Sequence, residues 1–301
     1  MFIVSGGRTG TKYFGDTLGS IIRDARSFHE PDVINPEVWK EPGKEFPRLI
    51  RDFGVYNVVL GRILGRTGMR NLSQRHLSGR LDLNELVKEL QKQRRRVYRR
   101  MAEPLIIESN LGFYGVLPGL KALFPACKIA VFIRDPRTWV PSIINWGTMY
   151  GDRDWVTKLG FGRLTPNLIG DRYYAARWRQ MPRFEKVCWA WKAINSIILR
   201  DIAGHTDARV FRYEDLFESP SRESHFFALM DYLTSFSDRR FAYAKAPSVL
   251  NERIHRSPRQ IIPAWNNWSP PQAAALDQIC GPMMGRFHYG LEPQWQALLQ
   301  A

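Results

Sequence analysis

A short segment near the start of the chain combines glycines with basic residues. It is Ser5-Gly6-Gly7-Arg8-Thr9-Gly10-Thr11-Lys12-Tyr13, and it follows an apolar run at residues 2–4. Glycines let backbone N–H groups come close to a phosphate, and the N-terminus of a following helix adds a positive field. Arg8 and Lys12 add full charges at the same place. The segment therefore predicts a phosphate-binding loop, and the plainer alternative is a glycine turn with a charged rim.

The segment differs from the Walker A motif of P-loop kinases. That motif has a Lys directly after its last glycine, whereas here Thr11 follows Gly10 and Lys12 comes one position later. A P-loop-type kinase transferring phosphate would rely on that lysine. Such a kinase is therefore kept only as an alternative function.

Three residues that could move protons lie where apolar runs end. Glu30 follows the run that ends at Phe28, and Pro31 after it favours an extended turn that would fix the carboxylate. His29 adjoins Glu30 and has an unperturbed pKa suited to proton transfer near neutral pH. Glu108 ends a later apolar run. Each could act as a general base, and each carboxylate could instead pair with an Arg or a backbone N–H.

Short apolar runs alternate with helical patterns along the chain. The runs, read as buried strands, are Phe2–Val4, Ala25–Phe28, Leu105–Glu108, Lys128–Ile133 and Arg209–Arg212. The helical stretches are Thr11–Ile22, Leu111–Leu123, Arg137–Trp146, Phe184–Ile202 and Arg222–Ser235. This alternation predicts an α/β fold with a P-loop-like central parallel sheet flanked by helices. Ligands of such sheets bind at the carboxyl ends of the strands.

Residues 44–100 interrupt this alternation. They hold fifteen Lys and Arg but five Asp and Glu, which gives them a net charge of +10 within a chain total of +15. Asp82-Leu83-Asn84-Glu85 resembles a helix start with an acidic first turn. We therefore predict a single domain over residues 1–301 that contains a mainly helical, basic insertion at 44–100.

The insertion also contains a candidate amphipathic helix. Its apolar and basic residues recur at helical spacing, and they are Val55, Val58, Val59, Arg62, Ile63 and Arg66. The segment could cap an acceptor cleft or rest on an anionic membrane. Alternatively, its apolar face packs on the core. Under either of the first two hypotheses Arg94, Arg95 and Arg96 would contact the anionic partner.

Composition narrows the class of protein. The three cysteines, Cys127, Cys188 and Cys280, are too far apart for a disulfide framework or a cysteine zinc site, and the histidine spacing suggests no metal. We find neither a signal peptide nor an apolar stretch of about 18 residues. We expect a soluble cytoplasmic protein with optional peripheral membrane contact. The charge of +15 favours polyanionic partners.

Two motifs together resemble the PAPS-dependent sulfotransferase family, in which PAPS is 3'-phosphoadenosine 5'-phosphosulfate. Residues 8–12 are similar to the family's 5'-phosphosulfate loop, and Arg134 followed by Ser142 is similar to its 3'-phosphate site. Ser142 lies about two helical turns beyond the strand end, so both side chains can face one phosphate. The resemblance implies that Arg8 contacts the sulfate and that Gly7, Thr9, Gly10, Thr11 and Lys12 surround the 5'-phosphate. A non-catalytic basic module would explain the charge but not this pair of motifs.

Other matches to the family concern the adenine and the C-terminal segment. Tyr13 stands where many members have Trp beside adenine, and Tyr213 begins a YEDL-like segment that resembles the family's adenine contact. The cofactor-loop Lys-Gly pair of the family is absent, and Arg256 or Arg259 is the candidate replacement. The family's KxHLP-like segment with its His base is absent too, because Ile107-Glu108-Ser109-Asn110 occupies that place.

The resemblance is closest in style to bacterial carbohydrate and glycolipid sulfotransferases, which use a Glu some 20 to 30 positions after the loop. It implies transfer of a sulfuryl group from PAPS to a hydroxyl of a carbohydrate or glycolipid, without a metal and without a nucleic-acid partner. Glu30 lies 22 positions after Arg8 and is the first choice of base, ahead of His29 and Glu108. A phenol or small metabolite is the alternative acceptor.

Overall fold

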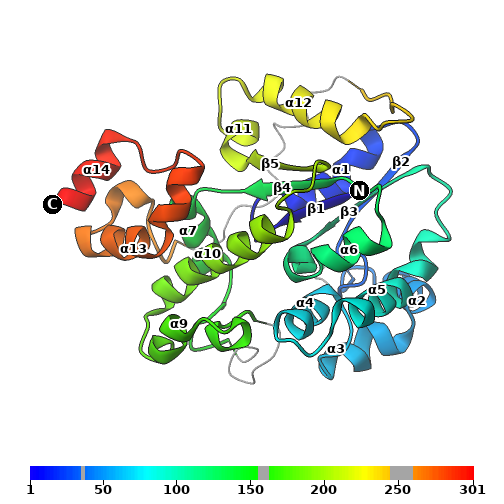
Figure 1. Cartoon of the computed structure of the whole chain (residues 1–301), viewed down its shortest axis with the longest axis horizontal. Helices are drawn as coiled ribbons and strands as arrows, with labels where there is room; N and C mark the ends of the chain where they lie inside the picture. The colour runs from blue at the N-terminus through cyan, green and yellow to red at the C-terminus, as the bar shows by residue number, and fades with distance from the viewer. Residues whose placement is uncertain (35–37, 155–162, 245–259) are drawn as a thin grey trace.

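The computed structural model describes residues 1–34, 38–154, 163–244 and 260–301. A five-stranded sheet lies at its centre (Figure 1). The strands are β1 (Phe2–Ser5), β2 (Ala25–His29), β3 (Leu105–Asn110), β4 (Ile129–Ile133) and β5 (Ala208–Arg212), in the order β2-β3-β1-β4-β5. All neighbouring strands are parallel, and Ile3 pairs with both Ser109 and Ala130. The predicted α/β fold is confirmed, and the carboxyl ends of the strands share one edge of the sheet.

Three helices cover one face of the sheet, namely α1 (Thr11–Ile21), α11 (Tyr213–Phe217) and α12 (Arg222–Thr234) (Figure 1). Phe14 of α1 stacks on Phe132 of β4, with ring centroids 4.5 Å apart. Helix α1 also lies against β2, because a Cβ added to Gly15 would stand only 2.6 Å from the His29 Cβ. This close approach fixes the glycine loop, at the start of α1, relative to the end of β2.

The opposite face carries η2 (Leu111–Gly115), α6 (Leu117–Leu123), α7 (Pro136–Trp146) and α10 (Arg183–Asp201). The prediction of one helix over residues 111–123 is wrong in its first part, because η2 is a 3-10 turn and α6 begins only afterwards. Pro118 cannot donate a hydrogen bond to the carbonyl of Tyr114, so a continuous helix is interrupted there. Gly112 packs tightly on the insertion, where an added Cβ would lie 2.5 Å from the Arg70 nitrogen.

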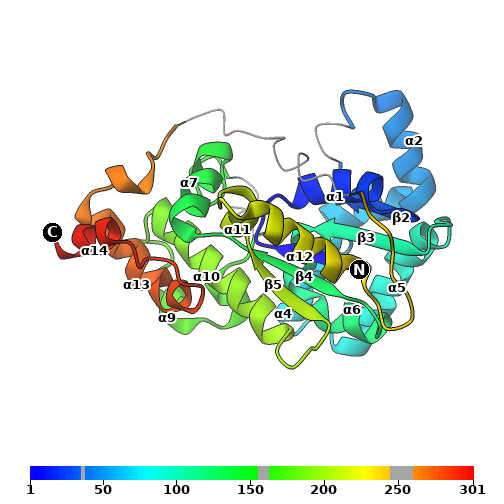
Figure 2. The same cartoon turned by 90° about the horizontal axis from the view of Figure 1, so that it is seen from above.

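The segment between β2 and β3 forms helices at one end of the molecule (Figures 1 and 2). They are α2 (Pro42–Phe53), the π-helix η1 (Tyr56–Leu60), α3 (Gly61–Ile63), α4 (Met69–Leu77) and α5 (Leu83–Tyr98). The predicted helix start at residue 82 is confirmed, because Asp82 and Glu85 form a reciprocal capping box. The predicted amphipathic helix over residues 55–66 is instead η1 joined to the very short α3.

Helices from the second half of the chain lie at the other end of the molecule (Figure 2). They are η3 (Pro166–Ile169), α9 (Arg172–Arg177), η5 (Trp265–Asn267), α13 (Pro270–Arg286) and α14 (Pro293–Gln300). Helix α13 packs on α10, and Trp295 of α14 is fully buried in the same core. Within the described residues, no helix combines the length and apolarity that crossing a membrane requires.

Candidate active site

The glycine loop has the backbone form of an anion-binding turn. Gly7 and Gly10 have positive φ angles of 86° and 79°, which glycine adopts without strain. Gly10 is the N-cap of α1 and supplies no capping side chain, so the first N–H groups of the helix are directed into the loop. The Thr9 hydroxyl is buried and has no hydrogen-bond partner among the described residues. A phosphate oxygen in the loop would satisfy groups of this kind.

Neighbouring elements hold the loop in place from several sides. The Trp139 Nε1 of α7 donates to the Gly7 carbonyl oxygen at 2.6 Å, and the Gly7 N–H donates to Ser5 Oγ at 3.0 Å. The hydroxyl of Ser109, at the end of β3, donates to the Thr11 carbonyl oxygen at 2.9 Å. The loop is therefore anchored to β3 and α7 as well as to its own strand.

The two predicted phosphate-binding segments meet at Arg8. The Arg8 Nε donates to Ser142 Oγ at 2.9 Å, and the Arg134 Nη1 donates to the Arg8 carbonyl oxygen at 2.8 Å. Arg8 has a φ of 55°, which is unusual for a residue with a side chain. Burial lowers the pKa of Arg8, and the nearby charge of Arg134 lowers it further. The site thus concentrates positive charge that a bound anion would stabilise.

Aromatic side chains line the side of the site next to β5. The Arg134 guanidinium lies 4.3 Å from the centroid of the Tyr213 ring, and Tyr213 stacks on Phe217 with centroids 4.8 Å apart. Tyr13 meets the same Phe217 edge to face at 5.7 Å. The two predicted adenine-side tyrosines are therefore brought to one aromatic cluster, joined through Phe217.

Lys12 lies on the first turn of α1 and points along the helix. Its Nζ forms an ion pair with Asp16 at 2.5 Å, and both side chains are partly exposed to solvent. A partly exposed i,i+4 pair of this kind is weak, so the ammonium can turn to a stronger anion. In this arrangement Lys12 stands beside the loop rather than inside it.

Glu30 and His29 lie at the end of β2 and close to the loop. The Glu30 Oε1 accepts a hydrogen bond from the Leu111 N–H at 3.2 Å, and the Leu111 side chain would lie 3.3 Å from a Cβ added to Gly7. His29 Nε2 lies 3.8 Å from Glu30 Oε2. Burial lowers the pKa of His29, against the opposing charge of Glu30, so the neutral imidazole is favoured.

The backbone of Glu30 differs from the extended turn that Pro31 predicts. Its φ is 41°, in the left-handed region. The turn is closed by the Val33 N–H, which donates to the Glu30 carbonyl oxygen at 3.0 Å. Arg8 and Glu30 are thus both held in a backbone conformation that costs about 1–3 kcal/mol for an ordinary residue. Such strain is typical of functional positions.

Glu108 is placed for structure rather than proton transfer. It is fully buried and accepts two hydrogen bonds from Arg94, at 2.7 Å and 2.9 Å. The Tyr98 hydroxyl donates to the same carboxylate at 2.5 Å. Arg94 also contacts Asp32, which Arg62 reaches at 2.5 Å. The prediction that Arg94 contacts an anionic partner is therefore wrong, because its guanidinium is buried, and the buried Glu108 has no route to an acceptor.

The buried ion cluster of Asp32, Arg94 and Glu108 nevertheless supports the site. Asp32 belongs to the turn that begins at Glu30, so its ion pairs with Arg94 and Arg62 hold that turn against α5 and α3. Burial alone would raise the pKa of Asp32. The charges of Arg94 and Arg62 outweigh that effect and hold the pKa of Asp32 below its ordinary value.

Several residues at the site escape sequence reasoning. The Arg8 guanidinium lies 4.6 Å from the ring centroid of Trp146, and the Trp191 Nε1 donates to the Arg134 carbonyl oxygen at 2.8 Å. Like Trp139, these tryptophans come from α7 and α10. Their only sequence signal is the clustering of large aromatics on the two helices that follow the phosphate-binding segments. Arg256 and Arg259 lie outside the described residues.

Comparison with known proteins adds two similar structures. No family model and no curated protein matches the chain. A sulfotransferase from Alicyclobacillus acidocaldarius is 13% identical, with a TM-score of 0.44 and coverage of 98% of this chain and 97% of that one. The sulfotransferase domain from the curacin biosynthetic pathway is 14% identical, with a TM-score of 0.40 and coverage of 97% and 98%. Both of these proteins are sulfotransferases.

Proposed function

We propose that this protein is a sulfotransferase that transfers a sulfuryl group from PAPS to a hydroxyl acceptor. One observation carries the proposal. Arg134 and Ser142 follow Arg8 by 126 and 134 residues in the sequence. Both nevertheless form hydrogen bonds with Arg8 in the glycine loop. Two candidate anion-binding segments side by side would suit a nucleotide with phosphates at both its 5' and 3' positions. A nucleoside triphosphate would need only the loop.

The loop residues would hold the 5' end of the nucleotide. The N-terminus of α1, the Thr9 hydroxyl and the positive charges of Arg8 and Lys12 would surround the 5'-phosphosulfate. Arg134 and Ser142 would bind the 3'-phosphate, and Tyr13 and Tyr213 would lie beside the adenine. PAPS would supply the sulfuryl group when bound. The charge of Arg8, and that of Lys12 once its ammonium turns from Asp16 to the loop, would stabilise the negative charge that develops on the leaving oxygen.

Glu30 would act as the general base. Its carboxylate stands at the strand edge beside the loop, and one oxygen is oriented by the Leu111 N–H. The other oxygen, Oε2, faces His29 at 3.8 Å, so neutral His29 can orient Glu30 or receive the proton in its place. The acceptor oxygen would lose its proton to this pair as its bond to sulfur forms, while the bond from sulfur to the 5'-phosphate oxygen breaks and adenosine 3',5'-bisphosphate leaves.

We favour a carbohydrate or glycolipid acceptor. The support is the position of Glu30 after β2, which resembles the base of bacterial carbohydrate sulfotransferases. A phenol or another small metabolite would fit the same chemistry. A basic, mainly helical segment beside the turn that carries Glu30 is compatible with an acceptor that has an anionic part.

The test is transfer from PAPS to a panel of acceptors that includes glycans, glycolipids and phenols. Product sulfation and release of adenosine 3',5'-bisphosphate are followed by mass spectrometry, with and without a chelator. We expect turnover with PAPS that the chelator leaves unchanged. Turnover with ATP that requires Mg²⁺, and none with PAPS, would show a kinase instead.

A further inference from the structure

An unusual apolar surface lies on the segment η1–α3. Thirteen large hydrophobic side chains are exposed among the described residues, and six of them fall within ten consecutive positions. We call these six the apolar edge, and they are Val55, Tyr56, Val59, Leu60, Ile63 and Leu64. The most exposed is Ile63, at 68%. Single exposed hydrophobic side chains scattered over a surface are ordinary. A group of them close together indicates a surface that contacts a partner protein or a membrane.

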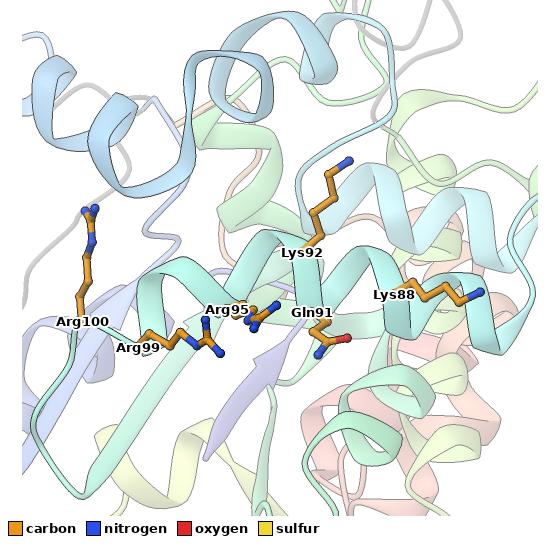
Figure 3. Close-up of a pocket in the computed structure, with 6 residues that line it drawn as sticks. All are labelled: Lys88, Gln91, Lys92, Arg95, Arg99 and Arg100. Atoms are coloured by element: carbon orange, nitrogen blue, oxygen red, sulfur yellow. The ribbon is translucent and has the colours of Figure 1, made fainter.

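A basic surface lies along α5. A shallow depression of about 670 Å³ is lined by Lys88, Gln91, Lys92, Arg95, Arg99 and Arg100, and we call it the basic groove (Figure 3). The spacing of Lys88, Gln91, Lys92, Arg95 and Arg99 places them on one stripe of the helix, and Arg100 follows the helix end. Lys88, Lys92, Arg95 and Arg99 form no ion pair with any described residue. The stripe therefore presents uncompensated positive charge to solvent.

The apolar edge and the basic groove are connected. Arg100, at the end of the groove, donates to Asp52 at 2.8 Å and to the Arg51 carbonyl oxygen at 3.3 Å. Both acceptors lie on the last turn of α2, and the apolar edge begins three residues later at Val55. Figure 3 shows Arg100 extending from the end of α5 toward the helices of the insertion. Apolar side chains thus adjoin a cationic stripe.

We propose that the apolar edge and the basic groove dock this protein on an anionic lipid bilayer. The apolar side chains enter the headgroup–acyl boundary, and the cationic stripe contacts the lipid phosphates. A second copy of the chain is disfavoured as the partner. Residues 44–100 carry a net charge of +10, and a dimer through this surface would bring two such segments together, which would repel each other.

Docking would place the membrane next to the acceptor side of the site. Arg62 lies between Leu60 and Ile63, and its guanidinium pairs with Asp32 in the turn that carries Glu30. A lipid-linked hydroxyl acceptor would therefore reach Glu30 from the docked face. This consequence rests on the proposed function, whereas docking itself does not.

The experiment is flotation of the full chain with vesicles of two compositions, phosphatidylcholine alone and equal parts of phosphatidylcholine and phosphatidylglycerol. We expect binding to the anionic vesicles that weakens as salt rises above about 0.1 M, where the Debye length is about 10 Å. The double variant Leu60→Glu/Ile63→Glu should bind at least tenfold more weakly. A second variant, Lys92→Glu/Arg95→Glu, should lose the preference for anionic vesicles.

The control is Leu291→Glu, which places one Glu at a side chain that, like Ile63, is 68% exposed but lies before α14, and it is matched to the single variant Ile63→Glu. It should bind vesicles like the wild type. Circular dichroism verifies that each variant is folded. Absence of wild-type binding at low salt, or equal loss in Leu291→Glu, would overturn the proposal. So would a wild-type dimer that Leu60→Glu/Ile63→Glu dissociates. Sulfation of a water-soluble acceptor tests the chemistry separately.

Discussion

Arg8 is the residue on which the candidate site is centred. Its backbone is held at a positive φ, its carbonyl oxygen accepts from Arg134, and its side chain reaches Ser142 and the Trp146 ring. A residue with so many separate restraints is preorganised, because little freedom is left to lose when an anion binds. Its positive charge can therefore act on a reacting group without first being reorganised.

Replacing Arg8 with Ala should lower kcat/KM for sulfuryl transfer by about 10–150-fold, since a charged contact contributes about 1.5–3 kcal/mol. Lys12→Ala should act in the same direction. Steady-state kinetics would measure both, with thermal unfolding to verify that the variants are folded. Arg23→Ala, which removes an exposed Arg beyond the other end of α1, is the control and should be unaffected. Near-full activity of Arg8→Ala would remove Arg8 from the catalytic residues.

Glu30→Gln should lower kcat by about 10²–10⁴, the usual contribution of a general base. The amide oxygen can still accept from the Leu111 N–H, so the turn and the affinity for nucleotide should hardly change. The measurement is single-turnover kinetics together with nucleotide binding, for Glu30→Gln and for His29→Asn. If His29→Asn is inactive while Glu30→Gln retains wild-type rates, His29 is the base.

At the scale of helices and strands, sequence patterns predict those features that depend only on residues close together in the chain. The strands follow from short apolar runs, and the start of α5 follows from Asp82 and Glu85. The break before α6 had a local signal in Pro118 that the helical pattern over residues 111–123 obscured, whereas the packing of Gly112 against α4 joins residues far apart and has no local signal. The same limit applies to Arg94, whose neighbours in sequence are basic but whose partners Asp32 and Glu108 lie 62 and 14 residues away.

The candidate site shows the same division. Gly7, Gly10 and Arg8 were found because loop, charge and helix start are adjacent in sequence. The supporting tryptophans Trp139 and Trp191 were missed, because their hydrogen bonds join residues far apart. No short-range pattern distinguishes a tryptophan that packs in the core from one that also holds a backbone carbonyl.

Two adjacent arginines of helix α5 allow a test of how much the buried ion cluster contributes to the stability of the fold. Arg94→Ala leaves Glu108 and Asp32 buried without their partner, which should destabilise the fold by about 3–5 kcal/mol. Arg95→Ala, one position later on the exposed side, should change the free energy of unfolding by less than about 0.5 kcal/mol. Urea denaturation measures both. Equal, small effects would show that the cluster contributes little to stability.

At the scale of the whole molecule, the C-terminal helices are tied to the end of β4. Arg137 is buried between the Trp265 and Trp295 rings, at 4.7 Å and 5.1 Å from their centroids. It pairs with Asp135 and with Glu292 just before α14, each at 2.6 Å. Because Asp135 adjoins Arg134, the distant end of the chain helps to position the second of the two predicted anion-binding segments. The single-domain organisation over residues 1–301, with an insertion at 44–100, stays a prediction.

A second tie reaches the same place from α13. The Tyr289 hydroxyl, beyond the end of that helix, donates to the Glu214 carboxylate at 2.6 Å, and the Glu214 carboxylate accepts from the Asp135 N–H at 2.9 Å. Burial raises the pKa of Glu214, although both hydrogen bonds oppose that shift. The segment that follows β5 is thereby joined to the segment that follows β4, next to Tyr213 and Arg134.

The most direct test of the account is calorimetric titration of the wild type and Arg134→Ala with adenosine 3',5'-bisphosphate and with adenosine 5'-monophosphate. We predict that the wild type binds the bisphosphate more tightly. Arg134→Ala should weaken that binding by about 10–150-fold, as expected for loss of a charged contact, and should barely change binding of the monophosphate. Failure of the wild type to bind the bisphosphate, or equal weakening for both nucleotides, would contradict the assignment of Arg134 to a 3'-phosphate and with it the proposed sulfotransferase site.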